Sequence, residues 1–125
     1  MKRKSQPAVI ALDRVPKKAV EAGKATSMQV LISADDAPNF AMRCFTIERG
    51  GSMPEHTNTV EHEQYVLSGR ATVGIAGKIY QVKQGDVVFI PAGEPHWYRT
   101  VGADAFRFLC LVPNKRDDIK LTERG

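Results

Sequence analysis

The chain has 125 residues, a length that suits one domain with a single hydrophobic core. Its hydrophobic fraction of 42% and charged fraction of 26% are ordinary for a globular protein and exclude wholesale disorder and membrane spans. The net charge of +4 arises at the N-terminus: residues 1–18 carry six basic side chains and one acidic one, and the remainder carries 12 basic and 13 acidic ones. We therefore expect no specific nucleic-acid partner. The basic start is expected to be a solvated arm, although such an arm could bind phosphate nonspecifically.

The apolar run at residues 8–12 follows this basic start and is ended by Asp13, so it is too short for the core of a signal peptide. We therefore expect a cytoplasmic protein with no membrane partner. The two cysteines, Cys44 and Cys110, lie in separate apolar segments. In a reducing compartment they are predicted to be buried free thiols rather than a disulfide.

After the arm, short apolar segments alternate with turns. Strands are predicted at residues 28–32, 40–48, 63–67, 71–75, 78–82, 87–90, 97–101 and 106–112. Glycine and proline punctuate the intervals, as in Arg49-Gly50-Gly51 and Pro91-Ala92-Gly93. A turn of helix within residues 15–23 is weakened by Pro16. The pattern predicts an all-β fold, either a sandwich or a closed antiparallel barrel.

All three histidines lie within two of these glycine-framed strand regions. His56 and His62 lie in the first region and His96 in the second. Any one of them alone would be interpreted as a surface or core histidine. Because residues two apart share a face of a strand, His56 and Asn58 can point inward together, as can His62 with Gln64. Neutral imidazole is the commonest protein ligand for transition metals, so three inward histidines predict one divalent metal site.

These segments resemble the cupin superfamily. Its first motif is a glycine, five residues, His-x-His, three or four residues, a glutamate, six residues and a glycine; the matching positions are Gly50, His56, Asn58, His62 and Gly69. Its second motif is a glycine, five residues, Pro-x-Gly, two residues, a histidine, three residues and an asparagine; the matching positions are Gly85, Pro91, Gly93, His96 and Thr100. The resemblance implies an all-β fold with a single cupin jelly-roll, also called a double-stranded β-helix barrel.

The chain is most similar to small single-domain cupins that bind manganese through four histidines. In those proteins a histidine replaces the motif's glutamate within a Glu-His-Glu triplet, as in Glu61-His62-Glu63 here. The similarity covers about residues 25–113, which implies a barrel domain over 25–113, a basic arm over 1–24 and a tail over 114–125. It also implies a homodimer whose N-terminal strands pack against the partner, and a Cys110 side chain that faces the pocket.

The sequence departs from this family pattern at Asn58 and Thr100. Thr100 is expected to affect only local hydrogen bonding. Asn58 replaces a histidine ligand, and an amide oxygen is a weaker ligand for a soft ion but acceptable for a harder one. The predicted shell is therefore His56, His62 and His96 with either Asn58 or water, and loss of the metal, known in some cupins, is the remaining alternative. Manganese or iron is expected, with zinc, nickel or copper as alternatives.

Three functions remain open, each with a small organic molecule as the partner. The first is a metal-dependent oxidoreductase of the dioxygenase or oxidative-cleavage type, because a three-histidine shell leaves coordination positions for substrate and an oxygen donor. The second is a binding module without turnover, and the third is a metal-assisted isomerase or cyclase acting on a sugar or polyketide. Candidate catalytic residues are Gln64, Tyr98 and Arg43, with Arg43 relevant only if it points inward; candidate substrate contacts are Phe40, Phe108 and Cys110.

Overall fold

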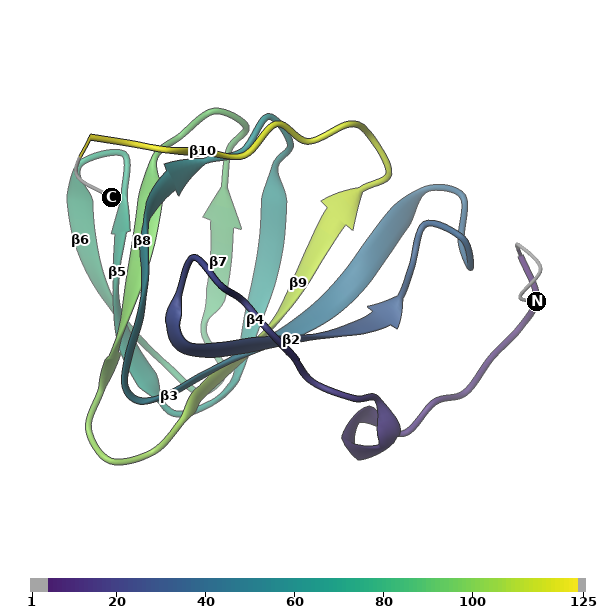
Figure 1. The fold of residues 1–125 in the computed structure, drawn as a ribbon, viewed down its shortest axis with the longest axis horizontal. Helices are drawn as coiled ribbons and strands as arrows, with labels where there is room; N and C mark the ends of the chain where they lie inside the picture. Colours follow the sequence, from purple (N-terminus) through teal and green to yellow (C-terminus); the bar gives the residue numbers. More distant parts are fainter. Residues whose placement is uncertain (1–4, 124–125) are drawn as a thin grey trace.

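The computed structural model describes residues 5–123 and is almost entirely β-structure (Figure 1). A short 3-10 helix, η1 (Leu12–Arg14), precedes ten strands. These are β1 (Lys18–Ala19), β2 (Lys24–Ile32), β3 (Phe40–Thr57), β4 (His62–Ser68), β5 (Arg70–Ile75), β6 (Lys78–Lys83), β7 (Val87–Ile90), β8 (His96–Val101), β9 (Phe106–Pro113) and β10 (Lys120–Leu121). The predicted all-β architecture is confirmed, and each predicted strand corresponds to an observed one.

The strands form one curled antiparallel sheet with the order β6-β5-β8-β3-β9-β4-β7. Strands β1 and β10 lie off this path, on β2 and β3 respectively, and β2 also pairs with β3. Figure 1 shows the sheet curling around, with β5, β6 and β8 at the left and β9 at the right. The curl brings strands from both halves of the chain around a common interior.

Strand β3 connects the two halves of the barrel, and it is longer than the sequence predicts. The predicted strand ended at Glu48, before the Arg49-Gly50-Gly51 turn, but the ladder continues to Thr57. Gly50 adopts a φ of +76°, and the β2–β3 register shifts where Ile47 pairs with Thr26 and Ser52 pairs with Lys24. Glycine tolerates this left-handed conformation, so the strand bends through a bulge instead of ending. The second half of β3 then pairs with β8 and carries His56 to its site.

Aromatic side chains dominate the core inside the curl. Phe108 stacks between Phe45 and Tyr98, with ring centroids 5.3 and 5.1 Å away. Phe106, also fully buried, packs against Phe108 at 5.3 Å. Residues 106, 108 and 110 point inward and the odd-numbered residues between them point outward, a choice that the apolar pattern of β9 alone leaves open.

The two ends of the chain differ from expectation. The helical turn forms at Leu12–Arg14 rather than within residues 15–23, where β1 pairs with β2 instead. The segment after residue 113 folds back along the barrel and pairs as β10 with residues 56 and 57 of β3. The basic residues 2–4 lie outside the described residues. Within residues 5–123, no helix is long and apolar enough to span a membrane.

Candidate metal centre and its cavity

The barrel encloses a cavity of about 330 Å³. Inward side chains of β2, β3, β4, β8 and β9 form its walls, and residues from both chain ends, including Val20, Ile119 and Leu121, line it as well. Its lining is mainly apolar, and the polar side chains in it are Arg43, His56, Asn58, His62, Gln64, His96, Tyr98 and Cys110. No Asp or Glu is among the lining residues. The candidate residues from both motifs therefore share one enclosed space.

The three histidines lie together in this cavity. His56 and His96 face each other across the β3–β8 ladder, with ring centroids 4.3 Å apart. The His62 ring, carried by β4, lies 5.5 Å from that of His96. All three side chains are buried, and His96 is the most buried at 1% exposure. The alternation that places residues 62 and 64 on one face accounts for the inward position of His62.

Backbone carbonyls orient two of the rings. His56 Nδ1 lies 2.8 Å from the carbonyl of Pro54, and His96 Nδ1 lies 2.9 Å from that of Glu94. A carbonyl only accepts hydrogen bonds, so each Nδ1 carries the hydrogen and each Nε2 keeps its lone pair. This is the arrangement that a histidine needs in order to bind a metal through Nε2. In both cases the carbonyl belongs to the residue two positions earlier.

Burial keeps two of the imidazoles, those of His62 and His96, neutral. It lowers the pKa of His62 to about 3, with the nearby Arg43 guanidinium as the next cause. It lowers the pKa of His96 to about 4, although the hydrogen bond to the Glu94 carbonyl acts in the opposite direction. Neutral imidazole is the form that coordinates a cation, so the site needs no deprotonation at neutral pH.

Asn58 completes the set of donors. Its Nδ2 donates to the carboxylate of Asp117 at 2.8 Å, and its Oδ1 is buried without a partner. Because a carboxylate accepts but does not donate, Asp117 fixes which end of the amide faces the cavity. Asp117 also accepts from the backbone N–H of Thr59 at 2.9 Å. The sequence motifs do not reveal Asp117, because it lies in the tail and 59 positions after Asn58.

The donor set fits a divalent cation. Five buried side-chain polar atoms lack a hydrogen-bond partner within residues 5–123, and three of them are His62 Nε2, His96 Nε2 and Asn58 Oδ1. Buried polar atoms are rarely left unpaired, so three in one cavity require an explanation such as an ion. Nevertheless, no three His, Cys, Asp or Glu side chains of the described chain converge as in a formed metal centre. The rings would therefore have to move closer together on metal binding, and the contact of His62 Nδ1 with Cys110 Sγ at 3.1 Å leaves Nε2 of that ring for the ion.

Two further candidates form a buried pair beside the histidines. Gln64 Nε2 donates to the Tyr98 hydroxyl at 2.7 Å, and the Tyr98 ring packs edge-on against His96 at 6.0 Å. Burial raises the pKa of Tyr98 far above its ordinary value. Tyr98 therefore stays protonated at neutral pH, and its hydroxyl can donate a hydrogen bond to a ligand in this cavity.

The remaining candidates divide between the two faces of the sheet. Arg43, Phe108 and Cys110 line the cavity, and Cys110 is a free buried thiol, as is Cys44. Phe40 does not line the cavity: its side chain is 56% exposed, because even-numbered residues in the first half of β3 face away from the interior. The prediction that Phe40 contacts a substrate in this cavity is therefore wrong.

Thr100, the second departure from the motif, lies in the barrel wall. Its Oγ1 donates to the backbone carbonyl of Ile47 at 3.2 Å, and the side chain is buried. It joins β8 to β3 and is not among the residues that line the cavity. Its role is therefore local hydrogen bonding.

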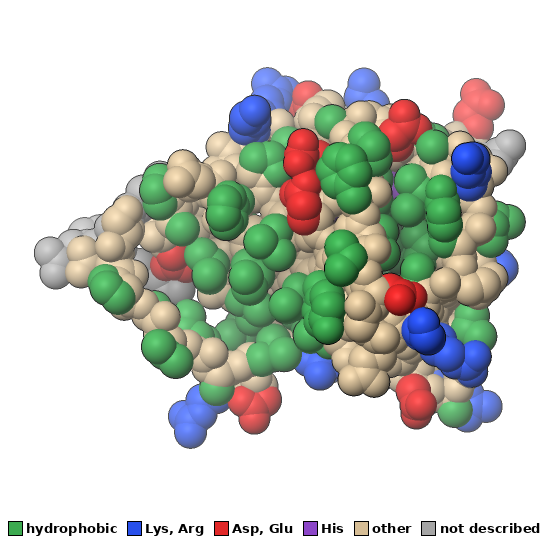
Figure 2. Space-filling view, turned by 180° about the vertical axis from the view of Figure 1, so that it is seen from behind, with side chains coloured by type: hydrophobic (Ala, Val, Ile, Leu, Met, Phe, Trp, Pro, Cys, Tyr) green, Lys and Arg blue, Asp and Glu red, His purple; other side chains and the backbone are tan. Residues whose placement is uncertain are grey.

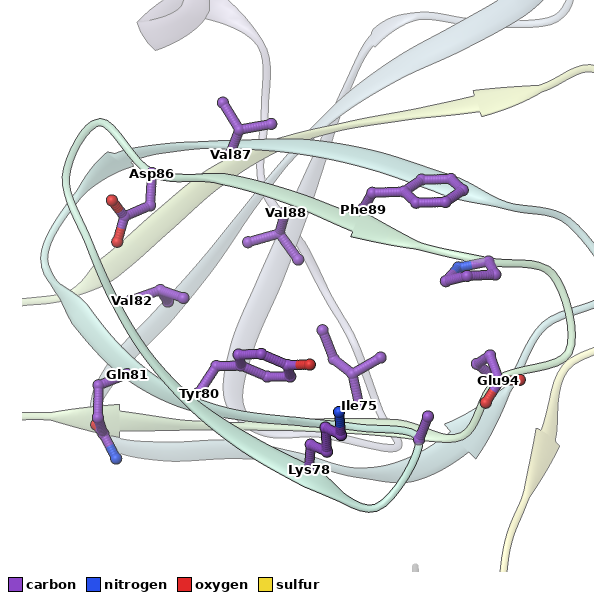
Figure 3. A pocket seen from close by; sticks show the side chains of 12 residues that line it. Ile75, Lys78, Tyr80, Gln81, Val82, Asp86, Val87, Val88, Phe89 and Glu94 are labelled. Atoms are coloured by element: carbon purple, nitrogen blue, oxygen red, sulfur yellow. The ribbon is translucent and has the colours of Figure 1, made fainter.

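A second hollow, of about 580 Å³, lies at the open seam between β6 and β7 (Figure 3). In Figure 3, Ile75, Tyr80 and Val88 point toward the space between these strands. None of the three histidines lines this hollow. It is therefore a less suitable place for metal chemistry than the interior cavity.

Comparison with known proteins agrees with the fold. Residues 43–112 match the model of the cupin domain. The polyketide cyclase RemF from Streptomyces resistomycificus is 31% identical, with a TM-score of 0.86 over 95% of this chain and 89% of that one. A cupin-2 domain protein from Rhodospirillum rubrum is 26% identical, with a TM-score of 0.76 over 97% and 84%.

Among curated proteins, the 1-methylthio-D-xylulose 5-phosphate methylsulfurylase of Rhodospirillum rubrum is 28% identical over 78% of this chain. The match covers 62% of that protein, and matches to uncharacterized proteins of Methanocaldococcus jannaschii and Streptomyces coelicolor cover 54% and 63% of theirs. The chain thus spans only about half to two thirds of the length of these relatives. The family model, which covers more than half of the chain, and the solved structures confirm the predicted single jelly-roll: this protein belongs to the cupin family.

Proposed function

We propose that the protein is a metal-dependent cyclase that acts on a small, largely apolar ketone substrate of the polyketide class. The observation that carries the proposal is the composition of the interior cavity: three histidines and an unpaired Asn58 oxygen stand next to a phenol that burial keeps protonated. Likeness to the polyketide cyclase RemF over nearly the whole of both chains supports the same class. This choice replaces the oxidoreductase as the leading interpretation.

His56, His62, His96 and Asn58 would hold one divalent cation through the Nε2 and Oδ1 atoms. Such a cation supplies Lewis-acid polarisation of a carbonyl oxygen. The apolar walls bind the carbon chain and exclude water. The proposed metal is manganese, iron or zinc.

Tyr98 is assigned the role of proton donor, and Gln64 positions it. The Tyr98 hydroxyl accepts the Gln64 Nε2 hydrogen, so its own hydrogen is free to reach a ligand oxygen. In an intramolecular aldol reaction, a methylene carbon adds to a ketone carbon, one C–C bond forms, and one proton moves overall from that methylene to the former ketone oxygen. The reaction consumes no oxidant, which separates it from the alternative below.

An oxidoreductase remains the second candidate because of one observation. Asn58 presents an amide oxygen where the related four-histidine site has an imidazole, and a weaker ligand is displaced more easily by an oxygen donor. O₂ consumption upon substrate addition distinguishes the two functions.

The test uses metal-loaded protein and a synthetic 1,3,5-triketone with an aromatic end group. We expect a cyclised product of the same mass, or lower by the mass of one water, with no O₂ uptake. Tyr98→Phe should keep the metal and lose about 100-fold or more in kcat, the scale of a lost general acid. Stoichiometric O₂ uptake would favour the oxidoreductase, and metal-free protein that cyclises as fast as loaded protein would refute the proposal.

The homodimer also remains a proposal, and the exposed apolar side chains that we use to argue it lie on β4 and β7, not on the N-terminal strands expected from the family resemblance. Tyr65, Val87 and Phe89 point outward from β4 and β7 with 46, 77 and 55% of their surfaces exposed. Figure 2 shows hydrophobic side chains across the middle of the face seen from behind, with Lys and Arg side chains near its edges. A second copy that covers such a face would remove this apolar surface from water. Sedimentation of the parent and of Phe89→Glu tests it, and a monomeric parent would contradict it.

A further inference from the structure

Arg43 places a guanidinium inside the cavity. It lies on β3 opposite Cys110 of β9, on the inward face that also carries Phe45. Its Cζ lies 5.1 Å from the centre of the Phe45 ring, and its Nη2 donates to Cys110 Sγ at 3.4 Å. The inward orientation that the sequence left open is therefore the observed one.

Within residues 5–123, the Arg43 guanidinium has no acidic partner. The ion pairs among the described residues include Lys17–Glu48, Lys83–Asp86 and Arg116–Asp118, and none of these three contains Arg43. Arg43 Nε is buried and makes no hydrogen bond, and the thiol that Nη2 contacts is a weak acceptor. A buried donor on a charged group is costly to leave unpaired, so the guanidinium has unused capacity for an anion.

The surroundings increase the attraction for an anion. The cavity has no Asp or Glu in its lining. A bound divalent cation would add positive charge, with Asp117 as the nearby carboxylate behind Asn58. Cys110 Sγ contacts both His62 Nδ1 and Arg43 Nη2, at 3.1 and 3.4 Å, so one small ligand can reach both the imidazole and the guanidinium.

We propose that Arg43 is the anion-binding group of this cavity and that the ligand is an oxo- or hydroxy-carboxylate. Its carboxylate binds the Arg43 guanidinium, and its neighbouring carbonyl or hydroxyl oxygen faces the histidines. Planar guanidinium and carboxylate groups form paired hydrogen bonds, which gives orientation as well as affinity. The assignment deepens the proposed function, because it makes the substrate a ketone that also carries a free carboxylate.

The experiment measures binding of salicylate by titration calorimetry, with salicylamide as the neutral analogue and inorganic phosphate as a second anion. Salicylate combines a carboxylate with an adjacent hydroxyl. We expect the parent protein to bind salicylate at least tenfold more tightly than salicylamide and more tightly than phosphate. Arg43→Gln should weaken salicylate binding by about 10- to 100-fold, the range for the loss of a hydrogen bond to a charged group. Arg43→Lys should lie between the two.

Arg99→Gln is the matched control. Arg99 also stacks on an aromatic ring, that of Trp97 at 5.4 Å, but its side chain is exposed on the outside of β8. It should bind salicylate like the parent. Equal loss in both variants, equal binding of salicylamide, tighter phosphate binding, or no salicylate binding with or without metal would each overturn the proposal.

Two features of this experiment separate a failure of the anion-site proposal from a failure of the proposed cyclase function. The salicylamide comparison needs no substitution, so it stands even if Arg43→Gln fails to fold. Metal content is measured on the same samples: salicylate binding that depends on Arg43 in a protein without metal affinity would refute the proposed cyclase and leave the anion site intact.

Discussion

Replacing Asp117 by alanine should weaken metal binding although Asp117 itself offers no oxygen to the ion. Its carboxylate accepts from Asn58 Nδ2 at 2.8 Å and from the Thr59 N–H at 2.9 Å. Without it, the Asn58 amide can rotate and turn its NH₂ group, which cannot coordinate, toward the histidines. Loss of such an outer hydrogen-bond partner typically costs about 10- to 100-fold in metal affinity. The expected change is therefore about 1.4–2.8 kcal/mol.

The tail should remain docked in this variant. Thr59 Oγ1 still contacts the Arg116 carbonyl at 3.2 Å and accepts from the Asp118 N–H at 2.9 Å. The strand pairing of β10 with β3 is also independent of the Asp117 side chain. A change in metal affinity would thus report on the orientation of Asn58 rather than on loss of the tail.

The assay is competition between the metal-free protein and a chelator of known affinity, for zinc and for manganese. Cobalt absorption provides a second readout, because its visible bands respond to ligand number and type. Asp118→Ala is the control: it removes the same charge one residue later, where the side chain is exposed and bonded only to Arg116. The reasoning is refuted if Asp117→Ala holds metal within twofold of the parent, or if the control loses as much.

Three other outcomes follow from the site and the fold. Asn58→His should slow chelator-driven metal loss and lower any turnover, since imidazole is the stronger donor and closes a coordination position; faster loss or faster reaction than the parent would contradict this. Burial holds the pKa of His62 at about 3 and that of His96 at about 4, so below about 6.5 the unfolded chain binds more protons than the folded one. Stability of the metal-free protein should then fall as pH drops from 6.5 toward 4, by up to about 1.4 kcal/mol per pH unit for each histidine; denaturant titrations check the slope, which His62→Gln should reduce. Gly85→Ala should lower the free energy of unfolding by about 1–2 kcal/mol, because Gly85 has a left-handed φ that alanine rarely adopts. Gly69→Ala should lower it further, because the added Cβ would also overlap the backbone carbonyl of Ala105. Equal shifts in Tm for the two variants would show that this overlap relaxes.

The sequence predicts the strands well because alternation is a local signal. Residues 62, 64 and 66 alternate with exposed neighbours, and β4 carries that pattern directly into the barrel wall. The course of β3 was less predictable. A Gly-Gly pair usually ends a strand, and only the pairing of β3 with β8 and β10 beyond the bulge extends it to Thr57. That pairing is a property of the whole sheet.

The orientation of side chains on β3 and β9 could not be predicted from the sequence, for a different reason. Both parities of each strand are rich in apolar residues, so hydrophobicity does not say which face is inside. Packing of Phe45 against Phe108 decides the question. The same choice turns Arg43 into the cavity and Phe40 out of it. Of the two candidates, only Arg43 is therefore placed to contact a ligand in the cavity.

Asn58 shows how far a motif can define a site. By residue type alone it is a departure that weakens the shell, because an amide can present either its oxygen or its nitrogen. The structure removes this ambiguity through Asp117, whose carboxylate can pair only with the NH₂ end. In the proposed metal site, Asn58 and the acidic residue in the tail therefore act together, although the tail lies outside the matched cupin domain. Substituting either residue should change metal affinity, and substituting both should cost less than the sum of the two separate effects, because the second change removes a contact that the first has already broken.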